Sequence, residues 1–482
     1  MKLTASLAPT RPVRIATALA LIMLTLSACT LGPTYQRPAL GQPARFHTDA
    51  PASTSAPARL DAWWDGFNDP ELDRVVERAI AQNLDIEQAR ARILQSRAVA
   101  KAAGAALAPQ ANAVASAADQ SQSLLSPIGE IGRHLPGFRR GVDVYDVGAA
   151  ASWEIDLFGG LRRERDAARA DARASEAQAT AVRISVAADA ADAYLQVRAY
   201  QARIEVARRQ EATEQDLVAL LERRSAQGVA ADRELRLTRA ELERVRASIP
   251  PLIAALEAQL NRLDVLMGAQ PGTYRDELAA TAPIPAAPAM ATGSPVDLLR
   301  RRPDVVAAEH RLIAANARIG AAIADYYPKL SITGLLGVES VDAGRLFTGD
   351  ALQHQIGAGL RWRLFDFGRV DAEVAEARGR DAEALAAYRS SVLHASEDVE
   401  NALSDMVQQQ ARAQALGRQI AELTVARGQA EQAYEGGVIS LIEVRDADRE
   451  LLTASDQLAQ AKADAARAAV ASFRALGGGW AA

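Results

Sequence analysis

The chain has 482 residues, of which 49% are hydrophobic and only 5% aromatic, and its formal net charge is −5. This length allows two or three ordinary domains or one large repeated unit. The mildly acidic balance excludes a strongly basic nucleic-acid-binding protein, so nucleic acid is not an expected partner. Alanine supplies much of the apolar share, which favours closely packed helices over a thick layered core.

Residues 1–28 have the pattern of a signal peptide. Three basic residues precede the apolar run Ile15–Leu24, which is too short to cross a bilayer as a helix. The tetrapeptide LSAC, ending at Cys29, resembles a bacterial lipobox, so we expect cleavage before Cys29 and lipidation of its thiol. The alternative is an ordinary signal peptide with an incidental cysteine. Cys29 is the only cysteine in the sequence, which excludes an intrachain disulfide.

Residues 29–62 are then expected to form a lipid-anchored N-terminal segment. Lipoproteins of the inner membrane often have aspartate after the lipidated cysteine, so by resemblance Thr30 favours the outer membrane. No later segment has 18 consecutive apolar residues, and no transmembrane helix is therefore expected.

The rest of the chain has the pattern of a duplication. Phe158-Gly159 and Gly228 match Phe367-Gly368 and Gly437 at an offset of 209 residues, and Asp85 and Pro109 match Asp304 and Pro328 at an offset of 219. Constant offsets over most of each half indicate two copies of one structural unit. We assign residues 63–267 to repeat 1, 268–294 to a linker, 295–476 to repeat 2 and 477–482 to a C-terminal tail.

Each repeat is predicted to begin with a helix, about Pro70 to Leu107 in the first copy and Val296 to Ala324 in the second. A proline follows each helix and stops it, because proline lacks an N–H donor and restricts the residue before it. Two strands come next. A long helix then starts after the Phe-Gly pair, turns at a Gly-Val pair and returns as a second helix.

The strands are predicted from strict alternation. In Gln355–Leu364 every second residue is apolar over ten positions, and similar patterns begin at Lys329 and cover Asp146–Ile155. This length suits a transmembrane β-strand, and the alternative is a soluble sheet with one wet face. Four strands cannot close a barrel, and an open edge in lipid leaves backbone groups unpaired, so a membrane assignment requires several chains in one barrel. The segment Ser121–Gly141 is expected to be a surface loop between the first two strands.

The positions of the turns predict the length of the long helices. The spans from Gly159 to Gly228 and from Gly368 to Gly437 each contain 69 steps, or roughly 100 Å if the helix is continuous. Beyond the second turn, small and apolar residues follow a 3,4 spacing from Val444 to Ala465, which indicates a coiled-coil seam.

Three segments carry a family resemblance. They are CTLGPTYQRP (residues 29–38), WWDGFNDPELDRVVERAIAQNLDIEQARARI (63–93) and RRPDVVAAEHRLIAANARIGAAIADYYPKLSITG (301–334). Together with the layout they resemble the outer-membrane factor family of efflux channels, the TolC- and OprM-like proteins, in its lipidated branch. The resemblance covers nearly the whole mature chain.

The resemblance implies an α+β membrane protein that forms a homotrimer. Four strands per chain would build a twelve-stranded barrel in the outer membrane, and the helical hairpins would build a periplasmic tunnel. The channel would conduct small molecules passively, working with a periplasmic adaptor protein and an inner-membrane transporter of the RND type. No catalysis and no cofactor are implied, apart from covalent lipid on Cys29.

The resemblance also implies a periplasmic gate just past the second hairpin turn. Matching the turn at Gly436 and Gly437 places its aliphatic residue and aspartate at Ile442 and Asp446, and a tyrosine ahead of the turn at Tyr434. Three copies of Asp446 around one axis would favour cations, and three Ile442 side chains would form an apolar constriction. The alternative is that Ile442 is a seam residue and Asp446 a solvated acid near a helix start.

The two hairpin tips match in position but differ in side chains. Gly228 marks the first turn, and it lacks the aliphatic–aspartate pair that follows the second. The arginines that flank the tyrosine in some relatives are Ala433 and Glu435 here, so an ion pair between subunits through those positions is not expected.

Other classes of protein fit less well. The five histidines are scattered without metal-ligand spacing, and no phosphate-loop or nucleophile-elbow motif is present, so an enzyme is not expected. A periplasmic adaptor would need one hairpin and flanking soluble β-domains. A structural coiled-coil lipoprotein would not need duplicated amphipathic strands. Both stay open as alternatives at the level of sequence.

Overall fold

The structure is a computed structural model of the chain, and it describes residues 30–41, 45–48, 59–229, 231–288, 290 and 301–480. Cys29 and the predicted signal peptide 1–28 lie outside the described residues, as do parts of the predicted N-terminal segment, linker and tail. The chain divides into two compact units, and each takes segments from both halves of the sequence. The boundaries of the predicted repeats stay a prediction.

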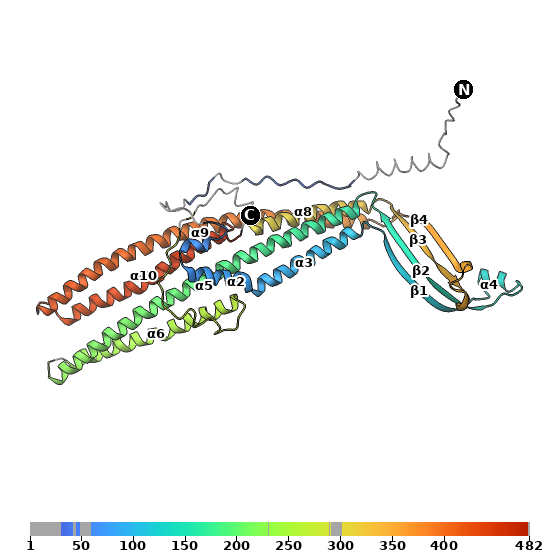
Figure 1. The fold of residues 1–482 in the computed structure, drawn as a ribbon. Coiled ribbons are helices and arrows are strands. Elements are labelled where there is room, and N and C mark those ends of the chain that lie inside the picture. Colours follow the sequence, from blue (N-terminus) through green and yellow to red (C-terminus); the bar gives the residue numbers. More distant parts are fainter. Residues whose placement is uncertain are drawn as a thin grey trace, which may run out of the picture. The chain divides into compact units, whose positions relative to one another are not determined.

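The first unit comprises Met1–Pro38, Leu94–Arg173 and His310–Ala386, and it contains the sheet. Four antiparallel strands lie in the order β1-β2-β3-β4 (Figure 1), so β1 and β4 form the two edges. Their bounds are β1 Gln110–Ser121, β2 Gly141–Ile155, β3 Lys329–Ser340 and β4 Leu352–Arg361. The loop between β1 and β2 covers the predicted connection and carries a short helix, α4 Pro127–Gly132.

The register of the strands joins the predicted apolar rows into one face. Ile332 pairs with Trp153 of β2 on one side and with Ala358 of β4 on the other. Side chains on this face are open to the surroundings of the chain, with Ile356 and Leu360 at 84% and 66% exposed. A continuous exposed apolar face of this kind fits contact with lipid and does not fit a soluble sheet with one wet face.

The element order recurs at the offsets that the sequence predicted. Helix α3 Leu84–Ala105 and strand β1 correspond at both ends to α8 Pro303–Ala324 and β3 at 219 residues. The long helices α5 Gly160–Ala226 and α6 Asp232–Leu266 correspond at both ends to α9 Arg369–Glu435 and α10 Leu441–Ala475 at 209 residues. Even the indole hydrogen bonds repeat, since Trp153 donates to the Leu107 carbonyl (3.0 Å) and Trp362 to the Tyr326 carbonyl (2.9 Å).

Small residues allow the helices of the first unit to pack closely. Ala167 and Ala170 of α5 form a buried cluster with Ala314 and Ala317 of α8. Alanine loses no side-chain entropy in a helix and lets two backbones approach, which explains the alanine-rich composition.

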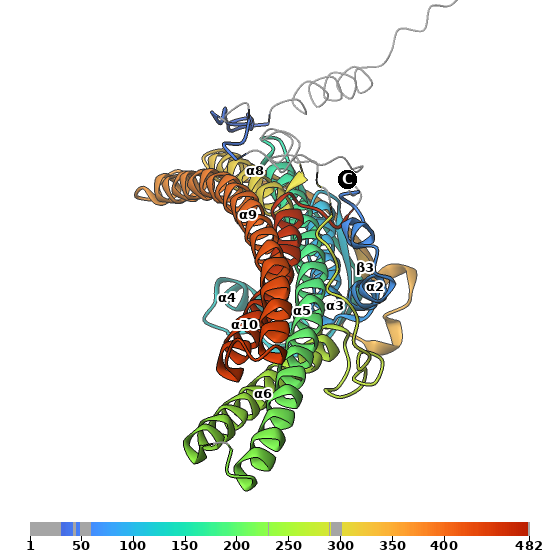
Figure 2. The ribbon, with the colours of Figure 1, turned by 90° about the vertical axis from the view of Figure 1, so that its left-hand side faces the viewer.

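The second unit comprises Ala39–Ile93, Ala174–Glu309 and Ala387–Ala482. It holds η1 Trp63–Phe67, α2 Pro70–Gln82 and most of the two helical hairpins, including both turns (Figure 2). Trp63 stacks on Phe473 of α10 with ring centroids 5.4 Å apart. Arg203 of α5 donates to Asp456 of α10 (2.7 Å), a contact that joins the two hairpins. In the parts of the chain that are described, no helix combines the length and hydrophobicity needed to cross a bilayer.

Two predicted elements need correction. The single helix from Pro70 to Leu107 is two helices, because Asn83 is extended (ψ 130°) and caps α3 by accepting from the N–H groups of Asp85 and Ile86. The Asn83 amide also donates to the Leu266 carbonyl (2.9 Å), a distant contact that local pattern cannot predict. In the second copy α8 spans Pro303–Ala324, and the predicted helix start at Val296 lies outside the described residues. Strand β4 is displaced by three residues towards the N-terminus relative to Gln355–Leu364.

Candidate functional site: the hairpin tips

The two hairpin turns have the same backbone. Gly228 and Gly437 adopt positive φ of 70° and 71°, a conformation that favours glycine after a helix. The N–H of Gly228 donates to Ser225 and that of Gly437 to Tyr434, both at 2.9 Å. Gly436 does not share the positive φ, and its N–H donates to the Gln432 carbonyl (3.0 Å) as a continuation of the helix. Of the adjacent glycines, the reversal therefore uses Gly437.

A capping interaction fixes the start of α10. The backbone N–H and the hydroxyl of Ser440 both donate to the Glu443 carboxylate at 3.2 Å. This closes the first turn around Ile442, whose side chain is 54% exposed. Asp446 lies one turn further on, half exposed, with Arg449 at 3.1 Å.

A cavity of about 380 Å³ lies beside these residues, between α5, α6 and α10. Its lining combines acids, bases and aliphatic side chains: Glu214, Ala231, Arg233, Glu234, Leu237, Glu241, Ile442, Arg445, Asp446 and Arg449. At the repeat offset of 209, Ile442 corresponds to Arg233 and Asp446 to Leu237. The equivalent positions of the two tips therefore line one cavity. Where the first tip has a base, the second has an apolar residue, and where the first tip has an apolar residue, the second has an acid.

An ion pair links the two hairpins at this cavity. Arg445 of α10 donates to the Glu214 carboxylate of α5 (3.2 Å) and to the Thr238 hydroxyl of α6 (3.1 Å). The Glu214 side chain is 12% exposed. Burial raises the pKa of the Glu214 carboxyl above its ordinary value, and the nearby Arg445 acts in the opposite direction.

A second contact joins the tips themselves. Arg224, at the end of α5, donates to the Tyr434 hydroxyl, at the end of α9, at 3.2 Å. The first hairpin thus supplies an arginine to the predicted gate tyrosine, whereas Ala433 and Glu435 flank that tyrosine in the second. Sequence reasoning missed Arg224, Arg445 and Glu214, because their contacts depend on how two distant hairpins pack.

The predicted gate residues are all placed at this end of the second hairpin. Tyr434 lies before the turn, and Ile442 and Asp446 lie in the first turns of α10. Arg233 and Leu237 could have been found from sequence, since the repeat offset alone aligns them with Ile442 and Asp446. The predicted lipidation site, Cys29, is outside the described residues.

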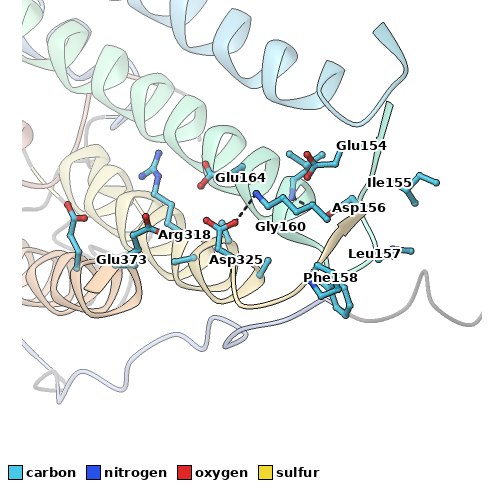
Figure 3. Close-up of a pocket in the computed structure, with 18 of the residues that line it drawn as sticks. Glu154, Ile155, Asp156, Leu157, Phe158, Gly160, Glu164, Arg318, Asp325 and Glu373 are labelled. Carbon is cyan, nitrogen blue, oxygen red and sulfur yellow. Dashed lines mark hydrogen bonds and ion pairs between the residues drawn. The ribbon is translucent and has the colours of Figure 1, made fainter. Parts of the chain in front are cut away.

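The first unit has a separate cavity of about 380 Å³ where β2 passes into α5 (Figure 3). Asp156, Glu164 and Asp325 are among its lining residues, and ion pairs join Asp156 to Arg162 (3.0 Å) and Asp325 to Lys329 (2.8 Å). These pairs tie the strand ends to the helices. Across the residues that the structure describes, no group of three or more potential ligands could hold a metal ion.

Known proteins are similar to this chain over nearly its whole length. The family model for outer membrane efflux proteins matches residues 75–269 and 295–478. The pyoverdine export outer membrane protein OpmQ of Pseudomonas putida is 32% identical over 461 residues, covering 95% of this chain and 96% of the relative. The outer membrane protein OprJ of Pseudomonas aeruginosa is also 32% identical, covering 95% of each chain.

Solved structures agree. The outer-membrane channel OprN superimposes with a TM-score of 0.83 at 33% identity, covering 94% of this chain and 100% of that one. The open-state MtrE channel of Neisseria gonorrhoeae gives a TM-score of 0.82 at 27% identity, covering 94% and 99%.

These similarities define the class of protein as a trimeric outer-membrane channel with a β-barrel and a periplasmic helical tunnel. The chain belongs to the outer membrane efflux protein family. It is the outer-membrane channel of a tripartite efflux pump, which decides against the two alternatives left open by the sequence, an adaptor and a purely structural lipoprotein.

Proposed function

We propose that the mature chain is anchored by lipid on Cys29 and conducts small molecules passively, without catalysing a reaction. Its cargo would come from an RND-type inner-membrane transporter through a periplasmic adaptor. The signal-like residues 1–28 and the LSAC tetrapeptide support the anchor. The family membership supports the two partners, since a channel in the outer membrane cannot energise export by itself.

The choice of cargo is assigned to the transporter. Relatives that match along nearly their whole length carry names that refer to pyoverdine, toluene and cations. One channel architecture thus accompanies chemically unlike compounds. A wide conduit that accepts whatever the pump delivers explains this better than a selective binding site in the channel.

The tip of the second hairpin is proposed as the periplasmic gate, formed by Tyr434, Ile442 and Asp446. The observation that carries this proposal is the cavity that the two hairpins share. Ile442 and Asp446 of the second hairpin line it, and so do their counterparts in the first hairpin, Arg233 and Leu237. In a trimer, three Ile442 side chains would narrow the tunnel and three Asp446 carboxylates would attract cations there. The ion pair of Arg445 with Glu214 would hold the second hairpin against the first in the closed state.

The test is bilayer conductance of purified trimers. Asp446→Ala should raise conductance and reduce cation preference, because it removes an acid from the constriction. Asp232→Ala is the matched control, since Asp232 is a first-turn acid of α6 that does not line the cavity. Unchanged conductance and selectivity in Asp446→Ala, or equal changes in both variants, would remove the gate assignment.

A further inference from the structure

The residues that follow Cys29 are held by hydrogen bonds and close backbone contacts. We call Thr30–Gly32 the strap, and Phe158, Gly159, Arg163 and Gly320 the strap site. The Leu31 N–H donates to the Phe158 carbonyl (3.3 Å). Arg163 donates from Nε to the Leu31 carbonyl (2.9 Å) and from a terminal nitrogen to the Gly32 carbonyl (3.3 Å). All of these residues belong to the first unit.

The contact is so close that it requires glycine. Gly32 has φ of +92°, and a Cβ built on it would overlap the Gly320 Cα. A Cβ on Gly320, inside α8, would lie 2.6 Å from the Leu31 carbonyl oxygen and 2.8 Å from Nε of Arg163. A Cβ on Gly159 would lie 3.0 Å from the Thr30 Cα. The strap therefore runs with its backbone directly against the backbone of α8 and of the β2–α5 junction, where Figure 3 shows Phe158.

The duplication provides an internal comparison. In the other copy, the position of Gly320 is occupied by Lys101, at the offset of 219, and that of Arg163 by Ala372, at the offset of 209. Gly368 is the counterpart of Gly159, and a Cβ on Gly368 would meet nothing within 4 Å. Of each pair of equivalent positions, only the one that contacts the strap has the glycine (Gly320) or the arginine (Arg163). They serve the N-terminal segment and are not a general requirement of the repeated fold.

We propose that the strap site fixes the lipid anchor at the level where β2 ends, so that anchor and barrel strands enter the outer membrane in a set register. Strand β2 ends at Ile155, three residues before the Phe158 carbonyl that binds Leu31. The strap is adjacent in sequence to the proposed acylated residue. Each residue of an unbound linker would add up to ~3.5 Å to the distance between the anchor and the strands. A bound strap keeps this distance short and so holds the strands at the membrane surface at a high effective concentration.

This inference rests on the proposed lipidation of Cys29, and its ligand is the inner-leaflet lipid surface reached through the acyl chains. It predicts that the strap site promotes assembly of the trimer in the membrane, and does so only when the chain is acylated. Arg163 and Gly320 are positioning residues in this account.

The first experiment compares two glycines. Gly320→Ala inserts a methyl group into the strap contact, whereas Gly104→Ala changes a glycine of α3, the counterpart helix, around which a Cβ would meet nothing within 4 Å. The measured quantity is the fraction of outer-membrane protein that runs as heat-stable trimer. We expect a severalfold loss for Gly320→Ala and none for Gly104→Ala. Equal behaviour of the two variants would overturn the proposal.

A double-mutant cycle separates anchor positioning from simple packing. Gly320→Ala is combined with Cys29→Ser behind an ordinary cleavable signal peptide, so that no lipid is attached. We expect Gly320→Ala to have no further effect on trimer yield in the unacylated chain. The same severalfold loss in both backgrounds would show that the strap contributes only packing, and would overturn the proposal.

A third variant keeps every strap contact. Insertion of Gly-Ser between Cys29 and Thr30 lengthens the tether without touching the strap site, and we expect a loss of trimer similar to that of Gly320→Ala. A normal yield of trimer from the acylated insertion variant would contradict the proposed register between the lipid anchor and the barrel strands. Mass spectrometry of the N-terminal peptide reads lipidation separately: an unacylated peptide overturns the lipid anchor and this inference together, and an acylated peptide with unaffected assembly overturns this inference alone.

Discussion

The two helical hairpins have the same backbone and different tips. Helices α5 and α9 have 67 residues each, α6 and α10 have 35, and both turns use a glycine with positive φ. The first tip presents Arg233 and Leu237 where the second presents Ile442 and Asp446. Duplication kept the geometry that places four positions around one cavity, and substitution made the two sides of the cavity unlike.

The gating function is expected to depend on the side chains in which the two hairpin tips differ. A symmetric pair of hairpins would suffice to build a tunnel wall, because coiled-coil packing depends on the shared seam. A gate needs two arrangements of the same parts, and contacts between unlike tips, such as Arg445 with Glu214, can be made in one arrangement and broken in another.

Breaking the link between the hairpins should have the largest effect. Arg445→Ala leaves the largely buried Glu214 carboxylate without its arginine, a loss of about 1–3 kcal/mol of coupling, or ~5–150-fold in the open population. Bilayer recordings should show higher open probability. Exchange of the charges, Arg445→Glu with Glu214→Arg, should restore closure.

The control for this prediction lies within the first hairpin. Arg239 pairs with Glu222 on its exposed surface (2.6 Å), so Arg239→Ala removes an arginine without affecting the link between hairpins. It should behave as the parent. An Arg445→Ala channel with the parent's open probability would show that this pair does not hold the closed state.

Making the tips alike should abolish the cation preference. The double variant Ile442→Arg and Asp446→Leu gives the second tip the residues of the first. It replaces an acid ring by a basic ring in the trimer, so the ratio of cation to anion permeability should fall severalfold. Reversal-potential measurements in a salt gradient report this ratio. A retained cation preference would place the selective ring elsewhere.

Acid should open the channel through Glu214. The raised pKa of this carboxyl means that the folded chain takes up the proton at a higher pH than an ordinary glutamate does. Protonation therefore favours the folded chain at this site, and the consequence of falling pH is loss of the ion pair and not unfolding. Conductance should rise severalfold as the pH falls towards the ordinary glutamate value of ~4.3.

Glu214→Gln tests this pH response. The amide cannot form the ion pair at any pH, so conductance should be high and nearly independent of pH over the range in which the parent responds. A variant that keeps the full pH dependence would assign the response to another group.

The contact between the tips should have the smallest effect. Tyr434→Phe removes the hydroxyl that accepts from Arg224, a hydrogen bond near the surface worth about 0.5–1.5 kcal/mol. Open probability should rise by no more than about tenfold, and Arg224→Met should give a similar result. A larger change in Tyr434→Phe alone would show that the tyrosine also bonds a neighbouring chain.

The sequence predicted the parts of the fold that repeat. Helix and strand ends recur at 209 and 219 residues because the same local signals, such as Phe158-Gly159 and Phe367-Gly368, occur in both copies. The apolar rows of the strands were predicted from alternation, and the observed register places them on one face.

Contacts between distant segments could not be predicted in this way. The break at Asn83 depends on a cap and on the Leu266 carbonyl, and both are invisible to helical periodicity. The link from Arg445 to Glu214 spans 231 residues, so no local pattern carries it. The position of Ile442 and Asp446 came from family resemblance, and the unlike cavity lining around them appears only when the hairpins are packed together.

The proposed gate requires that the second tip, and not the first, narrows the trimeric tunnel. Single cysteines at Ile442 and, as the matched position, at Arg233 test it directly, since the one native cysteine is at the proposed lipidation site. A short bifunctional thiol reagent is added to trimers in bilayers. We expect Ile442→Cys chains to become linked to one another and to lose conductance, whereas Arg233→Cys chains should do neither. Equal linkage and equal loss of conductance at both positions would contradict it.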